Sequence, residues 1–305
     1  MTKANDFITN DNKILPPKND VVFKALFTRG KESITKAFLE DILKTKIEKI
    51  DLDKSKDLIN DNKEDKNGRL DLRAVLNGNI ECDIEIQLKV HKYEMERFLY
   101  YWSKIYSANL KTGNKYGKLR KTISVIILGE NLDILKEVEK SHTVWNIREK
   151  EYQKIILTNY LELHIIELSK ALKEYKNNPK DEVLQWMMFL DNPENMEVQK
   201  IMEENEDIKE AKEELDIISA DRGLRELAVD RIILEADRLQ YIEDAKEEGI
   251  KEGIKTGIEK QKIEIIKKML SKGKSIEEIV DLTDIDIETV RKVSNECQIG
   301  DTHQN

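Results

Sequence analysis

The stretch RLDLRAVLNGNIECDIEIQL, residues 69–88, decides the fold prediction. Two runs of alternating apolar and polar residues flank Asn-Gly-Asn at 77–79, a pattern typical of a β-hairpin. With a three-residue loop, Leu72 faces Ile84, and one face of the hairpin is wholly apolar. A two-residue loop would set Asp71 against Ile84 and mix apolar and charged residues on both faces. The sequence therefore predicts the three-residue register.

The opposite face of this hairpin is charged. The same register pairs Asp71 with Glu85 and Arg73 with Asp83. Directly opposed Cβ atoms lie about 4.5–5.5 Å apart, where like charges destabilise a sheet. A divalent cation between the two carboxylates is one explanation, because Mg²⁺ and Mn²⁺ prefer oxygen ligands. An ordinary amphipathic hairpin, balanced by nearby arginine and lysine side chains, is the other, and the pattern alone leaves both open.

The segments around the hairpin indicate helices mixed with strands. Residues 21–44 have helical apolar spacing, interrupted at 29–30, and Asn19 or Asp20 is suited to cap the first helix. An aromatic-rich helix is expected over residues 91–111, and a buried strand over 122–128. This alternation predicts an α/β domain, and we expect it to cover residues 1–150.

The remainder is expected to be helical. Residues 155–176 and 183–190 show helical spacing of apolar residues, and the Glu- and Lys-rich region up to 261 is typical of long solvated helices or a coiled-coil-like arm. Glycines recur every fourth residue at 249, 253 and 257. They indicate either a close helix contact, as between subunits, or a frayed helix. Residues 151–261 are thus expected to form a helical region with a role in oligomerisation.

Residues 262–305 are expected to form a small helix-turn-helix-like unit with a tail. Ser275 and Glu278 have the spacing of a capping box at the start of a short helix. The last helix offers only Arg291 and Lys292 as cations, which is little for reading bases. A role in assembly or regulation is at least as well supported as specific DNA binding.

Composition limits the classes of function. The chain has 305 residues, with 52 Lys and Arg against 61 Asp and Glu, and a net charge of −9, which excludes a globally basic, histone-like binder. Its apolar stretches are far shorter than the roughly 20 residues that span a membrane. No secretory leader is apparent, and two cysteines cannot form a disulfide framework. We therefore expect a cytoplasmic protein without membrane contact.

Four stretches together resemble one known family. They are NDVVFKALF at 19–27, GRLDLR at 68–73, IEIQ at 84–87 and RFLYYWSKIY at 97–106. An Asp on one strand followed by Glu-x-Gln on the next is similar to the PD-(D/E)xK nuclease fold. More specifically, the combination resembles the Rpn group of recombination-promoting nucleases, also described as PD-(D/E)xK-family transposases. The resemblance covers about residues 15–130 and implies a restriction-endonuclease-like α/β core followed by an all-helical region.

The resemblance also implies roles for individual residues. Asp71 and Glu85 would be catalytic metal ligands, with Mg²⁺ the expected metal and Mn²⁺ or Ca²⁺ the alternatives. Gln87 would stand at the position of the name-giving lysine, although a neutral side chain cannot supply charge, and Leu70 replaces the proline of the motif. Lys89, on the same strand face, could partly substitute for that lysine. Asp20 would be an accessory ligand or only a helix-capping residue.

The helix after the hairpin is the expected source of DNA contacts. Arg97, Tyr101 and Lys104 recur at helical spacing with Tyr100 beside them, so one stripe could offer cations and aromatic hydroxyls to a nucleic-acid backbone. The alternative is a helix that packs its apolar residues inward and merely exposes these charges.

The function implied is a metal-dependent DNA endonuclease with a role in recombination, transposition or phage defence. Its alternatives are a catalytically degenerate nuclease fold that acts as a DNA-binding or oligomeric scaffold, and a metal-dependent RNase. The expected partners are DNA and further copies of the chain.

Overall fold

The computed structural model describes residues 7, 10, 13–53, 72–110 and 112–301, with backbone alone at the end of the last helix. The chain divides into two compact units, Met1–Leu234 and Glu235–Asn305. Within the described residues, no helix is long and apolar enough to cross a bilayer.

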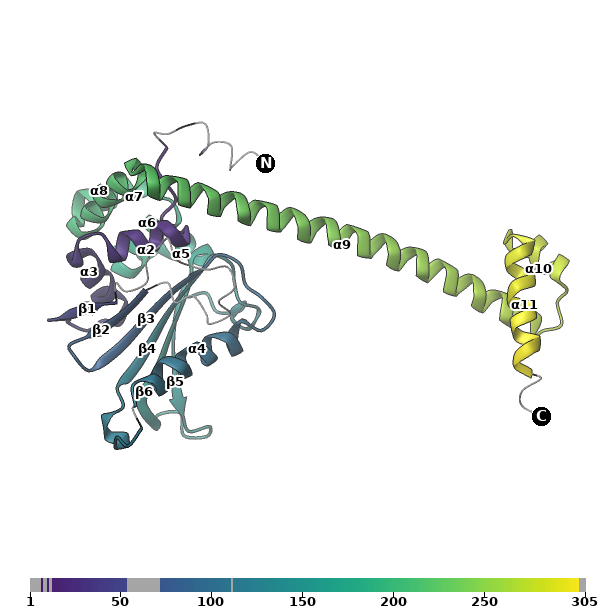
Figure 1. The fold of residues 1–305 in the computed structure, drawn as a ribbon, viewed down its shortest axis with the longest axis horizontal. Helices are drawn as coiled ribbons and strands as arrows, with labels where there is room; N and C mark the ends of the chain where they lie inside the picture. The colour runs from purple at the N-terminus through teal and green to yellow at the C-terminus, as the bar shows by residue number, and fades with distance from the viewer. Residues whose placement is uncertain (1–6, 8–9, 11–12, 54–71, 111, 302–305) are drawn as a thin grey trace. The chain divides into compact units, whose positions relative to one another are not determined.

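A mixed sheet organises the first unit (Figure 1). Among the described residues it has six strands in the order β1-β2-β3-β4-β6-β5. The central strands β3, β4 and β6 are parallel to one another, whereas the outer pairs are antiparallel. The strands are β1 (Ile50–Leu52), β2 (Leu72–Leu76), β3 (Ile80–Gln87), β4 (Lys121–Leu128), β5 (His142–Arg148) and β6 (Ile156–Glu167).

The predicted hairpin register is confirmed where the structure describes it. Leu72 pairs with Ile84 and Leu76 pairs with Ile80. Asn77 and Gly78 adopt positive φ angles of 50° and 74°, which the turn requires and which Asn and Gly tolerate best. The expected pairing of Asp71 with Glu85 lies outside the described residues, because Asp71 does.

Most predicted helices are also confirmed. Residues 21–44 form two helices, and Asn19 caps the first by accepting from the backbone N–H groups of Val21 and Val22. The helices of the first unit are α2 (Asp20–Thr28), α3 (Glu32–Leu43), α4 (Glu94–Ala108), α5 (Leu168–Tyr175), α6 (Glu182–Asp191), α7 (Met196–Glu204) and α8 (Glu206–Ala220), with short 3₁₀ turns at Tyr116–Lys118 and Asp133–Leu135. Helix α9 (Arg222–Leu270) begins in the first unit and continues into the second.

The helix predicted over residues 155–176 is wrong in its first half. Residues Ile156–Glu167 form β6, and only Leu168–Tyr175 is helical. Leucines here fit a helical spacing, but Leu161, Leu163 and Ile165 also alternate, and pairing with β4 and β5 on both sides selects the strand. Strand β6 continues the sheet past residue 150, and it pairs with β5, which the sequence did not reveal.

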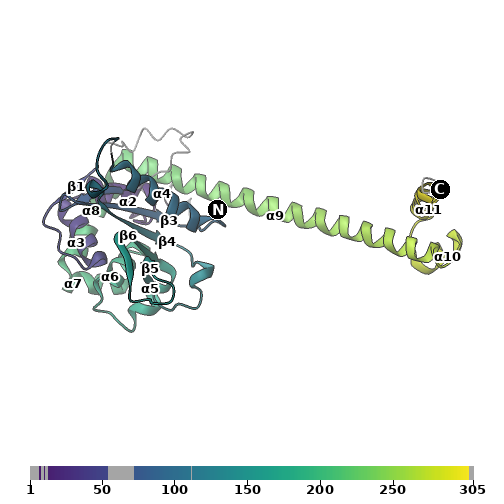
Figure 2. The ribbon, with the colours of Figure 1, turned by 90° about the horizontal axis from the view of Figure 1, so that it is seen from below.

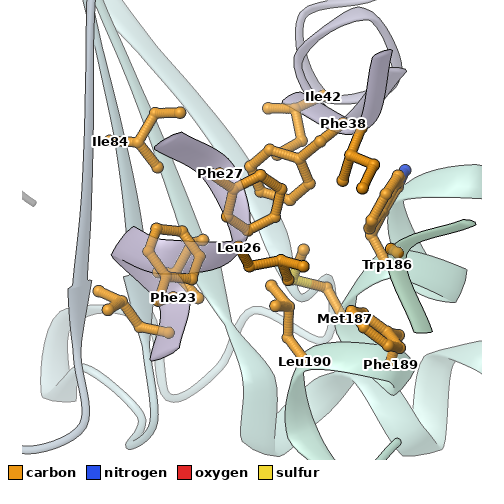
Figure 3. Packing of buried hydrophobic residues seen from close by; sticks show 14 of the residues in the cluster. Phe23, Leu26, Phe27, Phe38, Ile42, Ile84, Trp186, Met187, Phe189 and Leu190 are labelled. Atoms are coloured by element: carbon orange, nitrogen blue, oxygen red, sulfur yellow. The ribbon is translucent and has the colours of Figure 1, made fainter. Parts of the chain in front are cut away.

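The main core lies on one face of the sheet. Four aromatic side chains from three helices, Phe23, Phe27, Phe38 and Trp186, pack together there, with ring centroids as close as 4.6 Å (Figure 3). Ile84 and its apolar neighbours on β3 belong to the same cluster. On the opposite face, α4 packs against β3 and β4 (Figure 2). A smaller apolar cluster on this face joins Phe98 of α4 to residues of β4 and β6. The two faces of β3 are therefore both covered.

The second unit has a small core of its own. Near the end of α9, Ile266 packs with residues of α10 (Ile276–Thr283) and α11 (Ile287–Asp301). Ser275 and Glu278 form the predicted capping box at the start of α10, so the helical order expected for this region is confirmed. Its role in assembly or regulation stays a prediction.

Candidate active site

A buried row of carboxylates follows the polar face of β3. Side chains alternate between the faces of a strand, so Glu81, Asp83 and Glu85 point away from the apolar core. All three are nevertheless only 2–3% exposed. The sequence predicted a charged face, but it did not predict that this face is buried. Buried carboxylates need charged or hydrogen-bonding partners, and the partners here differ along the strand.

Glu85 lies against Arg97 of α4. The Nη2 atom of Arg97 is 2.6 Å from Oε1 of Glu85, and its Nη1 atom is 2.8 Å from Oε1 of Glu94. One guanidinium therefore bridges two carboxylates that are almost fully buried. This arrangement joins the predicted catalytic strand to the predicted DNA-contacting helix.

The environment of Glu85 favours its protonated form. Burial raises the pKa of Glu85 to about 7, because removing a carboxylate from water disfavours its charge. The positive charge of Arg97 acts in the opposite direction, and the charge of Glu94 adds to the rise. A carboxylate with a raised pKa beside a defined charge partner is typical of functional sites.

Glu81, at the other end of the row, is neutralised by two arginines. Arg73 on β2 approaches its Oε2 at 3.2 Å, and Arg120 just before β4 approaches its Oε1 at 2.8 Å. Both oxygens are thus engaged, and we assign this residue a structural rather than a catalytic role. The two ends of one strand face consequently have different chemistry.

Gln87 and Lys89 follow Glu85 along the chain but have other partners. The side-chain amide of Gln87 donates to the backbone oxygen of Lys89 at 2.9 Å. The amino group of Lys89 lies 2.5 Å from Glu130, and their hydrogen bond lowers the pKa of Glu130 below its ordinary value. This ion pair engages the amino group of the residue that could partly substitute for the lysine of the motif.

The four residues predicted to contact DNA lie together on α4. The Arg97 guanidinium is 5.6 Å from the ring centroid of Tyr101, the Lys104 amino group is 4.8 Å from that of Tyr100, and the two tyrosine rings are 5.5 Å apart. Phe98 of the same helix points into the smaller apolar cluster. The helix thus has an inward apolar side together with a row of interleaved cations and aromatic rings.

The carboxylate of Asp20 has an ion-pair partner and a hydrogen-bond partner within the protein. It begins α2, where its Oδ2 atom is 2.8 Å from Nε of Arg231 on α9, and its Oδ1 atom accepts from the N–H of Val21. Asn19 rather than Asp20 is the capping residue. The structure therefore provides no contact between Asp20 and Glu85, and a role as a metal ligand stays a prediction.

Glu94 is the residue that sequence reasoning missed. It is buried in the first turn of α4, holds Arg97, and accepts from the N–H of His91 at 3.0 Å. Its spacing of three residues from Arg97 puts both on one side of a helix and was a usable signal. A glutamate in a first helical turn is so common, however, that only its burial distinguishes it.

The carboxylate groups near Glu85 are of the ligand type that a hard divalent cation prefers. The described part of the chain contains no cluster of three or more His, Cys, Asp or Glu arranged to hold a metal. It does bring the oxygens of Glu85 and Glu94 around one positive group, and carboxylate oxygens are the ligands that Mg²⁺ prefers. Asp71, the other expected ligand, lies outside the described residues.

A comparison with protein families agrees with this geometry. The model of a family described as PD-(D/E)XK nuclease family transposase matches residues 17–245, well over half of the 305 residues. The chain belongs to this family. Both the resemblance and the fold class expected from the sequence, a mixed α/β core followed by a helical region, are thereby confirmed. No curated protein and no solved structure shows significant similarity to the chain.

Membership in this family carries a functional implication. It implies nuclease and transposition-related activity, with DNA as the substrate, and the family typically uses divalent metals.

Proposed function

We propose that the protein is a metal-dependent DNA endonuclease that hydrolyses phosphodiester bonds and serves DNA recombination, transposition or phage defence. The observation that carries this proposal is Glu85, a buried carboxylate on the polar face of β3 that contacts Arg97 of the covering helix. Stability alone does not favour a carboxylate at such a position, because its burial is costly. A site for a metal and a phosphate explains it.

Asp71 and Glu85 would hold the metal, with Mg²⁺ expected. Asp71 immediately precedes Leu72, the partner of Ile84, in the sequence, and would supply the second carboxylate. The bound metal would lower the pKa of a water molecule and neutralise charge on the scissile phosphate. Gln87 would orient that water through its amide without adding charge. Glu94 would position Arg97.

Arg97 and the row on α4 would hold the substrate. The guanidinium of Arg97 is half-buried, so Arg97 can keep its contact with Glu85 and still offer N–H groups to a phosphate oxygen. Tyr100, Tyr101 and Lys104 extend this surface along the helix. Contacts of this kind position a nucleic-acid backbone without reading its sequence.

Nicking of supercoiled plasmid tests the proposal. Wild-type protein, Asp71→Ala, Glu85→Ala and the matched control Glu96→Gln, an exposed glutamate of α4, would be assayed with Mg²⁺, Mn²⁺, Ca²⁺ or EDTA. We expect cleavage by the wild type and the control only, and none in EDTA. Equal cleavage by all four proteins would exclude this site as its source.

The same assay separates the two alternatives. Folded wild-type protein that binds DNA in EDTA but cleaves it neither in EDTA nor with any of the three metals would be a scaffold rather than a nuclease. A parallel panel of single-stranded RNA, duplex RNA and duplex DNA identifies the substrate class. Preferential cleavage of RNA would replace the DNA endonuclease assignment by an RNase.

A further inference from the structure

We propose that helix α9, within the second unit, is an antiparallel interface between two copies of this chain. Its surface carries an apolar seam that no other described part of the chain covers, formed by Leu239, Ile250, Ile254, Ile258 and Ile265. These side chains are 38–59% exposed. At 3.6 residues per turn they lie within an arc of about 100° on the helix. Apolar residues gathered on one side of a long helix favour packing against another helix.

Three glycines beside this seam support a close approach. A Cβ atom added to Gly249, Gly253 or Gly257 would meet nothing within 4 Å in the described chain. Glycine weakens a helix interior, and no contact among the described residues offsets that weakening at these positions. A helix packed across the seam would use the space, since a residue without a side chain lets two helices come close.

Charge along α9 identifies the occupant as a second copy. From Glu235 to Glu248 there are six acidic and two basic residues, a net charge of −4, and from Gly249 to Lys268 there are six basic and three acidic residues, a net charge of +3. An antiparallel pair of identical helices places each acidic half beside a basic half. A parallel pair would place like charges together along its whole length. The helix is therefore complementary to itself in one orientation.

A two-fold axis between Lys251 and Glu252 is consistent with the apolar seam, the glycines and the charge pattern at once. It sets Ile250 against Gly253 of the second copy and Ile254 against Gly249 of the second copy, so that each of these isoleucines meets a glycine. The same axis sets Ile258 against Ala245 of the second copy, another small residue.

This register also pairs opposite charges. It places Glu243 opposite Lys260 of the second copy, and both residues lie within or beside the seam at 100° per residue. The seam ends where the small core of the second unit begins, because Ile266 is buried against α10 and α11. The interface would thus occupy the part of α9 that the described residues of its own chain leave uncovered.

The first test is the oligomeric state of the full chain. Light scattering after size exclusion should give twice the protomer mass of 35.6 kDa for the wild type. The double variant Ile254→Glu, Ile258→Glu should give the monomer mass with unchanged helical circular dichroism. Leu282→Glu, which changes an exposed apolar residue of the same unit outside the seam, is the control and should stay dimeric. A monomeric wild type, or a dimer that the double variant leaves intact, would overturn the proposal.

Charge reversal tests the orientation. The variants Glu243→Lys and Lys260→Glu should each weaken the dimer at least about threefold in Kd, because each brings two symmetry-related pairs of like charges together. A chain with both changes should regain the wild-type affinity, since both pairs are again opposite in sign. In a parallel dimer each residue faces its own copy, so reversal would leave affinity unchanged. That result would overturn the antiparallel arrangement.

Discussion

The two faces of β3 are equally buried, but burial stabilises the fold on one face and destabilises it on the other. Ile84 and Ile86 point into the main core and are at most 6% exposed, whereas Glu85 between them is 3% exposed on the opposite face. Burial of an isoleucine stabilises the fold, since its apolar surface leaves water. Burial of a carboxylate destabilises the fold, because the charge loses its hydration. Attraction to a nearby arginine offsets only part of this loss. The comparison separates residues retained for stability from those whose retention needs a function.

The pKa of Glu85 expresses this difference as a dependence on pH. Its folded-state pKa of about 7 lies above the ordinary value of 4.5. Between these two pH values the folded protein binds more protons at this site than the unfolded protein does. Stability therefore falls as pH rises through that window. At neutral pH, Glu85 works against the fold that the opposite face of its strand stabilises.

The largest effect is expected from Glu85→Gln. Without a carboxylate ligand, plasmid nicking should fall at least about 100-fold. The melting temperature at pH 7.5 should stay the same or rise, because the change removes a buried charge while keeping the shape. Nicking rates with Mg²⁺ and thermal unfolding of the apo protein measure the two effects. A variant that loses activity and stability together would instead mark Glu85 as a structural residue.

Ile84→Ala, one position earlier, should have the opposite profile. Truncation of a fully buried isoleucine typically lowers the free energy of unfolding by about 2–4 kcal/mol. The chemistry on the other face would be untouched, so the nicking rate per folded molecule should stay within about twofold of the wild type. Urea unfolding and active-fraction measurements at 15 °C check both statements. A large loss of activity in well-folded protein would show that the two faces are coupled.

Glu81→Gln tests whether every buried carboxylate of the row is functional. We expect a loss of about 1–2 kcal/mol of stability, since Arg73 and Arg120 lose a charged partner but remain partly exposed to water. Metal-dependent nicking should persist. If nicking instead disappeared while the protein stayed folded, the site would extend along the whole strand rather than centre on Glu85.

The sequence predicted features that depend on neighbouring residues, and it missed features that depend on how separate elements pack. The register of Leu72 with Ile84 was predictable because a strand has a period of two and its turn has a local signature. The burial of Glu81 and Glu85 was not, because it depends on how α4 packs over β3 and on Arg120, which is 39 residues from Glu81. The strand Ile156–Glu167 was missed for the same reason, since its pairing with β4 overrides a leucine spacing that fits a helix.

The smallest effect should come from a row of hydrogen-bonded polar side chains on the core-side face of the sheet, Glu162, His164 and His142. His164 lies beside Val125 of the core, its Nδ1 atom is 2.9 Å from Nε2 of His142, and its Nε2 atom is 3.0 Å from Glu162. Burial, and secondly the charge of His164, lower the pKa of His142 to about 4 from its ordinary 6.5. Between these pH values the unfolded protein binds more protons here, so stability falls as pH decreases.

His142 and Glu85 therefore oppose each other between about pH 4.5 and 6.5. In the wild type their contributions to the pH dependence of stability partly cancel. His142→Gln should lower the melting temperature slightly at pH 7, because it weakens a hydrogen bond that contributes about 1 kcal/mol. The pH dependence of stability in this variant should come from Glu85 alone, so its stability should rise as pH falls. Glu85→Gln should leave the opposite slope. Thermal unfolding of both variants at pH 7.0, 6.0 and 5.0 measures this directly, and slopes of the same sign would mean that the two faces of the sheet do not differ electrostatically in this way.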